Sequence, residues 1–407
     1  MIDAAVTYTL LFVSLYFEIF LLVAFLQRAF LSNTNISTAV SKYPKVAIIV
    51  PCYNEESGIS ATIASLLALQ YPKDAFEVIV VDDGSKDRTF EIAKQFEADS
   101  RVHVFHKENG GKHSAMNLGL SKTNAELIGC LDADSIVEPE ALLSIVSIFQ
   151  NEKVAAVTPG IHVKETGNLL QHMQKVEYRL SIFNRFMLAA LGSAFITPGP
   201  FSIFRASIVR ELGGWRYGHS TEDMEMALRM QDAGFLIANA PKAIVHTGTP
   251  KTIRKLFHQR VRWTYGWLRN AVDYRHMIGN RNYGNLGIII LPSALISIGA
   301  ALFFFFKIIL EFAVLAQHEF LKIQVTGTVP HPMFSFFYFN TSMMSILVWV
   351  AVGLILLLVA LGSLIGTGKR TLPIGTPLFV LFYSFLVPLW LGTAVVRAAF
   401  KTGVRWR

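Results

Sequence analysis

The sequence contains few charged residues and almost no cysteine. Only 16% of its 407 residues are charged and 52% are hydrophobic, whereas about a quarter of the residues in typical soluble domains are charged. The two cysteines, Cys52 and Cys130, lie in apparent strands, so they exclude a disulfide framework and are expected to be buried apolar side chains. The mean hydropathy of +0.43 instead predicts a membrane protein.

The sequence also lacks a long basic run, a P-loop and the glycine motif of dinucleotide-binding domains. Lys and Arg number 37 against 29 for Asp and Glu, which gives a formal net charge of +8. Without a basic run, this excess does not favour a nucleic acid as partner. Such an excess is expected in loops that face the anionic inner surface of a membrane, and it also suits an anionic substrate.

Four apolar segments are long enough to cross a bilayer, which takes about 20 residues. They cover approximately Tyr8–Phe30, Leu286–Ala316, Thr341–Gly366 and Pro377–Phe400. No Lys or Arg precedes the first segment and no cleavage site follows it, so a membrane helix is expected there rather than a signal peptide. Glu18 within this segment is either functional or paired with another helix, and pairing is slightly favoured. Lys307 is expected to pair with Glu311 on the second segment.

The basic residues predict the side of the membrane on which each loop lies. The loop GTGKR (366–370) and the linker that contains Lys42 and Lys45 are expected in the cytoplasm, together with the basic domain that follows the linker. Four complete crossings would then place the basic stretch 397–407 outside. Either the last segment is re-entrant or broken at Pro388, or the rule fails here, and the sequence leaves these alternatives open.

Residues from Val46 to about Val245 have the composition of a soluble α/β domain. The short β-branched runs KVAIIV, FEVIVVDDGS and ELIGCLDADS alternate with helical stretches. This pattern predicts a largely parallel sheet with helices on both faces. Because ligands of such sheets bind beyond the carboxyl ends of the strands, the polar residues after these strands are expected to meet in one crevice.

Acidic residues follow two of these strands. Asp132 and Asp134 are two positions apart, so their side chains face the same way. They repel each other unless a cation such as Mg²⁺ or Mn²⁺ neutralises them, although a simple turn would also explain them. Asp82 and Asp83 could bind the base or the ribose of a nucleotide. They could instead form an Asx turn, followed by a helix that Asp87 caps.

Three other stretches carry candidate binding residues. Tyr53 and Glu55 follow the first strand and offer a stacking face and an acceptor, unless they simply begin a helix. Lys112 follows two glycines, so it could contact a phosphate or belong to a surface turn. Asp223 is a candidate general base, but the local sequence slightly favours a capping box formed with Ser220.

A basic helix with interleaved aromatics is expected at residues 251–276, where the spacing of apolar residues is helical. An amphipathic helix with its aromatics at headgroup depth would explain most of this composition. It does not explain Gln259, Arg262 and Trp263, since Arg suits a bidentate contact with a diphosphate and an indole suits stacking on a sugar. His246, after another strand, is a weak candidate metal ligand.

The order of four motifs resembles that of the processive family 2 glycosyltransferases, which include the hyaluronan, cellulose, chitin and bacterial poly-N-acetylglucosamine synthases. The motifs are Asp82-Asp83, Asp132-Ala133-Asp134, Thr221-Glu222-Asp223 and the QxxRW stretch Gln259–Trp263. The resemblance covers about residues 40 to 275. It implies a Rossmann-like α/β domain of the GT-A type, inserted between transmembrane helices of a multi-pass cell-membrane protein, with the catalytic domain in the cytoplasm.

The resemblance further implies an activity and a role for each candidate residue. The protein would elongate and export a polysaccharide from a UDP-sugar, with UDP-N-acetylglucosamine favoured, alone or with UDP-glucuronic acid. A non-processive enzyme that adds one sugar to a membrane lipid is the alternative. Asp223 would be the catalytic base, and Asp132 and Asp134 would bind Mg²⁺ or Mn²⁺. The nucleotide-sugar would be bound by Tyr53, Glu55, Asp82, Asp83, Lys112, Asp132, Gln259 and Arg262, and the acceptor by Trp263, Gly199 and Glu222.

The expected organisation has five parts. These are a transmembrane helix (1–31), a linker (32–45), the GT-A domain (46–248), an interface helix with the QxxRW motif (249–280) and a membrane region of about three helices (281–407). The expected partners are the UDP-sugar, a polysaccharide or lipid acceptor and membrane lipids. Two copies of the chain would be needed if one copy has too few spans to form a channel.

Overall fold

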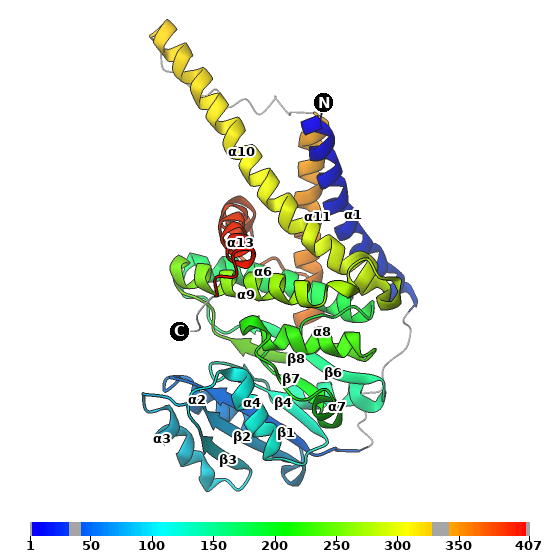
Figure 1. Cartoon of the computed structure of the whole chain (residues 1–407), viewed down its shortest axis with the longest axis vertical. Helices are drawn as coiled ribbons and strands as arrows, with labels where there is room; N and C mark the ends of the chain where they lie inside the picture. Colours follow the sequence, from blue (N-terminus) through cyan, green and yellow to red (C-terminus); the bar gives the residue numbers. More distant parts are fainter. Residues whose placement is uncertain (1, 32–41, 328–341, 404–407) are drawn as a thin grey trace.

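A mixed sheet lies at the centre of the computed structural model, which describes residues 2–31, 42–327 and 342–403 (Figure 1). Its strands are β1 (Val46–Cys52), β2 (Phe76–Asp82), β3 (Val102–His106), β4 (Leu127–Cys130), β5 (Ile136–Val137), β6 (Val154–Val163), β7 (Ser202–Arg205) and β8 (Leu236–Thr247). The spatial order is β3-β2-β1-β4-β7-β6-β8-β5. Strands β1 to β4 are parallel as expected, whereas β7 and β5 are antiparallel to their neighbours.

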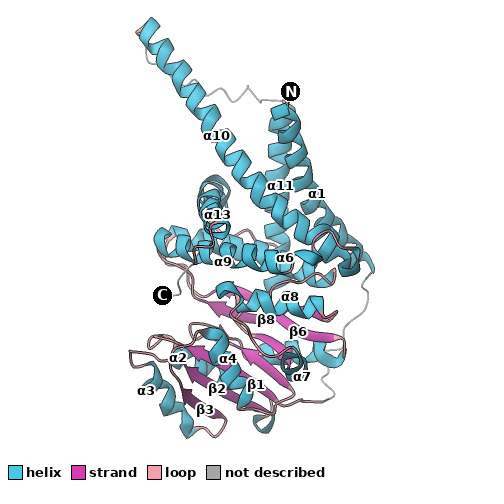
Figure 2. Cartoon of the chain, in the orientation of Figure 1, coloured by secondary structure: helices cyan, strands magenta, loops and turns pink. Residues whose placement is uncertain are grey.

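Helices cover both faces of the sheet, as the sequence predicts (Figure 2). The helices that pack on it include α2 (Ile59–Leu67), α3 (Thr89–Lys94), α5 (Ala141–Val146), α4 (Lys112–Ser121), α7 (Ala206–Glu211) and α8 (Glu222–Asp232). In β1, Ile48 and Val50 pack with α2, α3 and α5, while Ala47 and Ile49 pack with α4, α7 and α8. Burial on both faces explains why the strands appear in the sequence as continuous apolar runs.

The carboxyl ends of β1, β2 and β4 lie at one edge of the sheet. Cys52 is paired with Asp82, and Ile49 is paired with Cys130. The residues that follow each strand therefore leave the sheet side by side, which is the arrangement expected for a binding crevice. Cys52 and Cys130 are free and buried, as expected.

Two long helices, α6 (Leu169–Ala190) and α9 (Ile253–Asp273), lie between the sheet and the membrane helices (Figure 1). The Asn168 side chain caps α6 and the Thr252 side chain caps α9, each by accepting a hydrogen bond from a backbone N–H three residues on. The aromatic side chains of α9 differ in their exposure. Tyr265 and Trp267 are buried within the protein, whereas Trp263 is 37% exposed.

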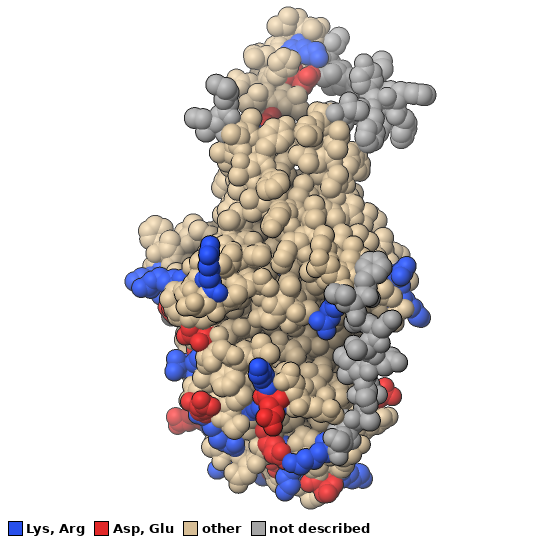
Figure 3. All heavy atoms as spheres, turned by 90° about the vertical axis from the view of Figure 1, so that its right-hand side faces the viewer, with Lys and Arg blue, Asp and Glu red and all other residues tan. Residues whose placement is uncertain are grey.

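Four helical segments in the described ranges are long and apolar enough to cross a membrane, and they coincide with the expected ones. They are Asp3–Arg28 within α1 (Ile2–Leu31), Leu286–Thr326 with α10 (Leu291–Thr326), Met343–Thr367 (α11), and Thr376–Ala399, which contains α12 (Thr376–Leu378) and α13 (Ser384–Ala399). Figure 3 shows a band nearly free of charged side chains between the charged far end of the molecule and the charged domain surface.

The charged residues inside these helices follow the sequence expectation only in part. Lys307 lies 3.3 Å from Glu311, as predicted, and 2.5 Å from Asp3 of α1. The prediction that Glu18 pairs with another helix is wrong, because its buried Oε2 has no hydrogen-bond partner in the described part of the chain. Its neighbours on α1, among them Phe17 and Leu21, pack against apolar side chains of α6 and α11.

The last apolar segment differs in direction from the other three. Figure 1 looks nearly along the axis of α13, whereas α1, α10 and α11 are seen lengthwise. Tyr383, Trp390 and Ala394 pack along α9 against Leu256 and Val261. A π-helical turn at Phe379–Tyr383 precedes α13, and Pro388 lies inside it. The segment therefore packs against α9.

Candidate active site

Lys112 lies between carboxylates that come from distant parts of the chain. Its Nζ is 2.5 Å from Oδ1 of Asp132, which follows β4, and 3.5 Å from Oε1 of Glu222, the first residue of α8. Burial alone would lower the pKa of Lys112, but Asp132, Glu222 and Asp223 together raise it well above its ordinary value. Lys112 therefore stays protonated within this cluster, and the interpretation that it belongs to a surface turn is wrong.

Gly199 forms the wall beside this ion pair. A Cβ atom at Gly199 would lie 2.7 and 2.8 Å from the carboxylate oxygens of Asp132, and closer still to Nζ of Lys112. A side chain therefore cannot be added here unless the ion pair moves. Gly199, a predicted acceptor residue, therefore lies directly against Lys112 and Asp132, which are predicted to bind the nucleotide-sugar.

Asp223 belongs to the same cluster and does not cap the helix. The predicted capping box is wrong, because the Ser220 hydroxyl contacts that of Tyr217 at 2.9 Å and no side chain caps α8. His219 and Ser220 both have positive φ angles, of 53° and 68°, which turn the chain away from cap geometry. The Asp223 carboxylate accepts a hydrogen bond from the backbone N–H of Met224.

The surroundings of Asp223 adjust its protonation. Burial and the neighbouring Glu222 carboxylate raise the pKa of Asp223 to about 6, although Lys112 and Arg262 act in the opposite direction. A carboxylate with a raised pKa accepts a proton more readily than an ordinary aspartate while it is still ionised at neutral pH. The environment therefore suits a general base.

The rate of a reaction in which Asp223 accepts a proton is expected to depend on the ionisation of its carboxyl group. Since only the ionised carboxylate can accept a proton, kcat/KM should fall about tenfold per pH unit once the pH drops below the raised pKa of Asp223. Initial rates measured from about pH 5 to about pH 8 would show the inflection. A profile without an inflection near pH 6 would contradict the assignment.

The segment before α8 is held against α9 by close contacts. Nδ2 of Asn270 donates to the backbone oxygen of Gly218 at 3.0 Å and to Oγ1 of Thr221 at 2.9 Å. Gly266 lies opposite Thr221, and Nη1 of Arg262 donates to the backbone oxygen of Ser220 at 3.2 Å. These contacts place Arg262 close enough to Asp223 to lower its pKa, so the QxxRW and Thr-Glu-Asp motifs share one site.

Replacing Gly266 with alanine is expected to disturb this junction. The new Cβ would lie 2.9 Å from Cβ of Thr221 and closer still to its Oγ1 and Cγ2. Because Thr221 is buried and branched, we expect a loss of about 1–3 kcal/mol in the free energy of unfolding, measured by thermal or chemical denaturation. Gly353→Ala is the matched control, since no atom lies within 4 Å of that Cβ position. Equal stability of the two variants would contradict this expectation.

The remaining residues of the QxxRW motif differ in their surroundings. Oε1 of Gln259 is buried and has no hydrogen-bond partner among the residues that the structure describes. Trp263 keeps an exposed face, with the Arg260 guanidinium 4.3 Å from its ring centroid. Arg260 itself is buried and paired with Glu177 of α6 at 2.7 Å, and the Tyr383 hydroxyl donates to the same carboxylate oxygen at 2.6 Å.

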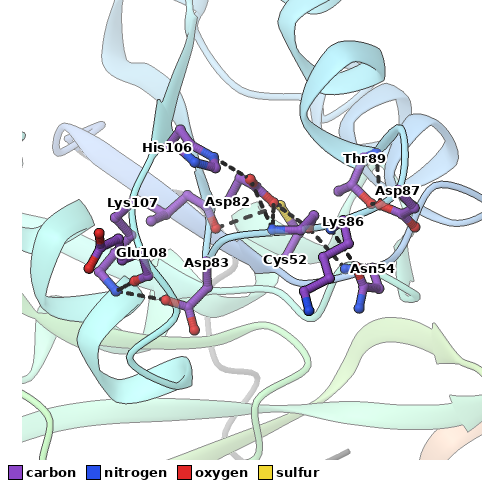
Figure 4. Close-up of polar contacts among 12 residues, drawn as sticks. Cys52, Asn54, Asp82, Asp83, Lys86, Asp87, Thr89, His106, Lys107 and Glu108 are labelled. Atoms are coloured by element: carbon purple, nitrogen blue, oxygen red, sulfur yellow. Dashed lines mark hydrogen bonds and ion pairs between the residues drawn. The ribbon is translucent and has the colours of Figure 1, made fainter.

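Asp82 and Asp83 bind groups of the protein itself (Figure 4). Asp82 contacts Nδ1 of His106 at 2.6 Å and accepts hydrogen bonds from the Ser85 hydroxyl and backbone N–H. Asp83 contacts Nζ of Lys107 at 2.7 Å and accepts from the backbone N–H groups of Gly110 and Gly111. Asp83 therefore fixes the two-glycine loop that leads into Lys112.

The loop after β1 lies beside this turn. The backbone N–H of Asn54 donates to the Ser85 hydroxyl at 2.9 Å, and that of Glu55 donates to Oγ1 of Thr89 at 2.8 Å. The predicted nucleotide-binding residues Tyr53 and Glu55 thus lie next to the Asp82–Asp83 turn. Asp87 accepts from the backbone N–H of Thr89, the first residue of α3, and lies one residue before the N-cap, Arg88, rather than at the cap position that the sequence predicts.

The chemistry of the Asp132 and Asp134 side chains fits a hard divalent cation. Solvent reaches Asp134, yet the many protein atoms around it raise its pKa, and the Asp132 carboxylate adds to this effect. Two neighbouring carboxylates repel each other unless a cation neutralises them. Mg²⁺ and Mn²⁺ bind carboxylate oxygens together with phosphate oxygens, so they suit this pair. His246 contacts Glu138 at 2.9 Å, and residues 2–31, 42–327 and 342–403 contain no cluster of three or more potential metal ligands.

Sequence reasoning missed two groups of residues that shape the site. His106 ends β3 and Lys107 follows it, so the rule that selected the polar residues at the ends of β1, β2 and β4 would have found them as well. The contacts among Glu177, Arg260 and Tyr383 join residues 83 and 206 positions apart in the sequence. No local pattern indicates a contact over such separations.

Comparisons with known proteins agree with this arrangement. A family described as "Glycosyltransferase like family 2" matches residues 44–266. A poly-β-1,6-N-acetyl-D-glucosamine synthase of Staphylococcus epidermidis is 31% identical over 224 residues, which are 54% of this chain and 54% of that protein. The enzyme of the same name from Staphylococcus aureus (strain COL) is 32% identical over 231 residues, 56% of this chain and 55% of its own length.

The chain thus spans about half the length of the curated relatives that it matches. The solved structure of the mannosyltransferase PcManGT from Pyrobaculum calidifontis, in complex with GDP-Man and Mn²⁺, is similar over 99% of this chain and 100% of that one, with a TM-score of 0.66 and 17% identity. This similarity supports the expected GT-A fold, and the family match confirms the expected class of enzyme. The chain belongs to glycosyltransferase family 2.

Proposed function

We propose that the protein is a membrane-embedded, processive, inverting β-glycosyltransferase that takes a UDP-sugar from the cytoplasm, elongates a polysaccharide and exports it. UDP-N-acetylglucosamine is the favoured donor, because both relatives described above are poly-β-1,6-N-acetyl-D-glucosamine synthases. One observation carries the proposal. Lys112, Asp132, Glu222, Asp223 and Arg262 come from four separate segments of the chain and lie close enough together to set the pKa of Asp223.

In the proposed reaction, the UDP-sugar binds across the carboxyl ends of β1, β2 and β4. Tyr53 and Glu55 lie beside the Asp82–Asp83 turn, where the uridine would bind. Lys112 and Arg262 would place two positive charges near the diphosphate, and a guanidinium suits bidentate contact with it. Neutralising the charge that develops on a leaving group lowers the barrier to its departure.

The acceptor hydroxyl would lie between Asp223 and the donor sugar. Asp223 would accept the proton of the acceptor hydroxyl. The hydroxyl oxygen would attack the anomeric carbon while the bond from that carbon to the diphosphate breaks. This direct displacement inverts the configuration of the anomeric carbon. Trp263 offers an exposed aromatic face for the terminal sugar, and Gly199 leaves room beside Asp132. Asp132 and Asp134 would hold Mg²⁺ or Mn²⁺, which supplies positive charge to the diphosphate when bound.

The proposal is tested with full-length protein in lipid nanodiscs and radiolabelled nucleotide sugars. UDP-N-acetylglucosamine, UDP-glucuronic acid, UDP-glucose and GDP-mannose are supplied singly and in pairs, with Mg²⁺, Mn²⁺ or a chelator. We expect a long, water-soluble polymer from UDP-N-acetylglucosamine and none with the chelator. Release of free sugar alone would overturn the proposed synthase activity.

Transfer of one sugar to a membrane lipid is the second candidate function. It is favoured by the small number of candidate spans, four in the described ranges, which leaves little protein to surround a polymer channel. It predicts a labelled product that is soluble in chloroform and carries a single sugar. The same assay therefore separates the two functions.

We infer that α1, α10 and α11 cross the membrane and that α13 lies at its inner surface. Three crossings put Arg28, Lys369, Arg370 and the C-terminal stretch on the side of the catalytic domain, in agreement with the positive-inside rule. In this arrangement the last apolar segment is re-entrant or broken at Pro388 and does not cross the membrane, which is one of the alternatives that the sequence leaves open. It is supported by the packing of α13 along α9.

Cysteine labelling in sealed vesicles is expected to reveal this topology. An impermeant maleimide should label Thr402→Cys, after α13, from the same side as Asp74→Cys on the catalytic domain. It should label Thr326→Cys, at the end of α10, from the opposite side. Labelling of Thr402→Cys together with Thr326→Cys would show instead that the last segment crosses.

A further inference from the structure

A second cavity, of about 240 Å³, lies between the end of β6, α6 and β8. It shares no lining residue with the cavity around Lys112 and Asp223. A Cβ atom at Gly366 of α11 would lie 3.2 Å from Nη1 of Arg179 and 3.3 Å from Cε1 of His162, and both of these residues line the cavity. The cavity therefore lies at the domain end of α11, next to the membrane-spanning part.

The charged side chains that line this cavity are cations. Lys164 follows β6, and Lys175 and Arg179 lie on α6. Of the carboxylates nearby, Glu138 contacts His246 at 2.9 Å, Glu177 contacts Arg260 at 2.7 Å, and Glu165, next to Lys164, is exposed to solvent. Within the described parts of the chain, none of the three cations forms an ion pair.

Arg179 is the most informative of them because it is half-buried. The hydrogen-bond partner of its Nη1 is Nδ1 of His162, at 2.9 Å, and burial lowers the pKa of Arg179. His162 is only 6% exposed, and in the described residues its Nε2 has no hydrogen-bond partner. Burying a guanidinium without a counter-charge is costly, so this arrangement indicates that an anion belongs in the cavity.

We propose that this cavity binds a phosphoryl group, carried by a membrane lipid or free in the cytoplasm. A guanidinium can form two parallel hydrogen bonds to a phosphate, and Lys164 and Lys175 would supply further charge at the opening. The position beside α11 favours a lipid headgroup as the source. Such a ligand would hold β6, α6 and α11 together, and its binding does not depend on the proposed transfer reaction.

Titration of purified full-length protein in phosphate-free detergent tests this site. The probes are dioctanoyl phosphatidic acid, dioctanoylglycerol (which lacks only the phosphate) and inorganic phosphate, with calorimetry as the readout. The variants are Arg179→Gln and Lys164→Gln, and the control is Lys73→Gln, an exposed cation that does not line the cavity. Because Lys164 is exposed, loss of binding in Lys164→Gln cannot be attributed to misfolding.

We expect phosphatidic acid to bind and dioctanoylglycerol not to bind. Each of Arg179→Gln and Lys164→Gln should weaken the binding about tenfold, the effect of losing one charge-assisted contact, while Lys73→Gln should bind as the wild type does. If inorganic phosphate binds as tightly and responds to the same variants, the site is supported and its source is soluble. Absence of binding to both phosphate probes, or unchanged binding in both cavity variants, would overturn the proposal.

Discussion

Replacing Asp223 with asparagine is expected to lower kcat about a thousandfold, because the amide cannot accept the acceptor's proton. The amide is nearly the same size as the carboxylate, and its oxygen can still accept the hydrogen bond from the N–H of Met224. Binding of the UDP-sugar should therefore change little. Initial rates from radiolabelled donor give kcat, and calorimetry with UDP gives the binding affinity.

The matched control for this variant is Asp74→Asn, which changes the same pair of groups on an exposed 3₁₀ turn. Its activity should equal that of the wild type. If Asp223→Asn retained more than about a tenth of the activity, Asp223 would not be the general base. A function independent of transfer, such as that of a receptor with an inactive domain, also predicts tolerance of this change.

Replacing Gly199 with alanine is expected to reduce kcat/KM about a hundredfold, the effect of displacing reacting groups by about 1 Å. The added methyl group would collide with both Lys112 and Asp132, so the ion pair would have to separate or shift. This changes the position of the proposed cation ligand Asp132 without removing any functional group. Steady-state rates measured at several Mg²⁺ or Mn²⁺ concentrations would show the loss.

Gly167→Ala provides the comparison for Gly199→Ala, because its nearest neighbour would be 3.5 Å from the new Cβ. Both variants should remain folded, as judged by circular dichroism and thermal unfolding. Similar activities of the two variants would mean that the contact between Gly199 and the Lys112–Asp132 pair does not matter for transfer.

The sheet was predictable from sequence where the strands are buried on both faces. The runs that became β1, β2 and β4 are mostly apolar and are followed by polar residues, so both their structure and the edge at which they end could be inferred. Strands β5 and β7 were not predicted, since they have two and four residues and exist through pairing with distant strands. Their antiparallel direction is a tertiary property.

The candidate site was predictable to the extent that its residues follow strands or form short motifs. Asp132, Lys112 and Asp223 were selected in this way, and the structure brings them together. The capping interpretation of Ser220 was wrong, because the positive φ angles of His219 and Ser220 are not evident in the sequence. The contacts of Asp83 with the backbone N–H groups of Gly110 and Gly111 were not predictable either, since they depend on how the loop after β3 folds back.

The Glu177 carboxylate joins three segments at one oxygen atom, which accepts from Arg260 of the QxxRW helix and from Tyr383 of the last apolar segment. Arg260 is buried, so separating it from Glu177 would leave an uncompensated charge. Any tilt of the C-terminal segment must therefore be followed by α9, which also carries Arg262. Bilayer thickness and lateral pressure in the surrounding lipid are therefore expected to act on Arg262, the side chain proposed to bind the diphosphate, and the turnover rate should vary with lipid chain length.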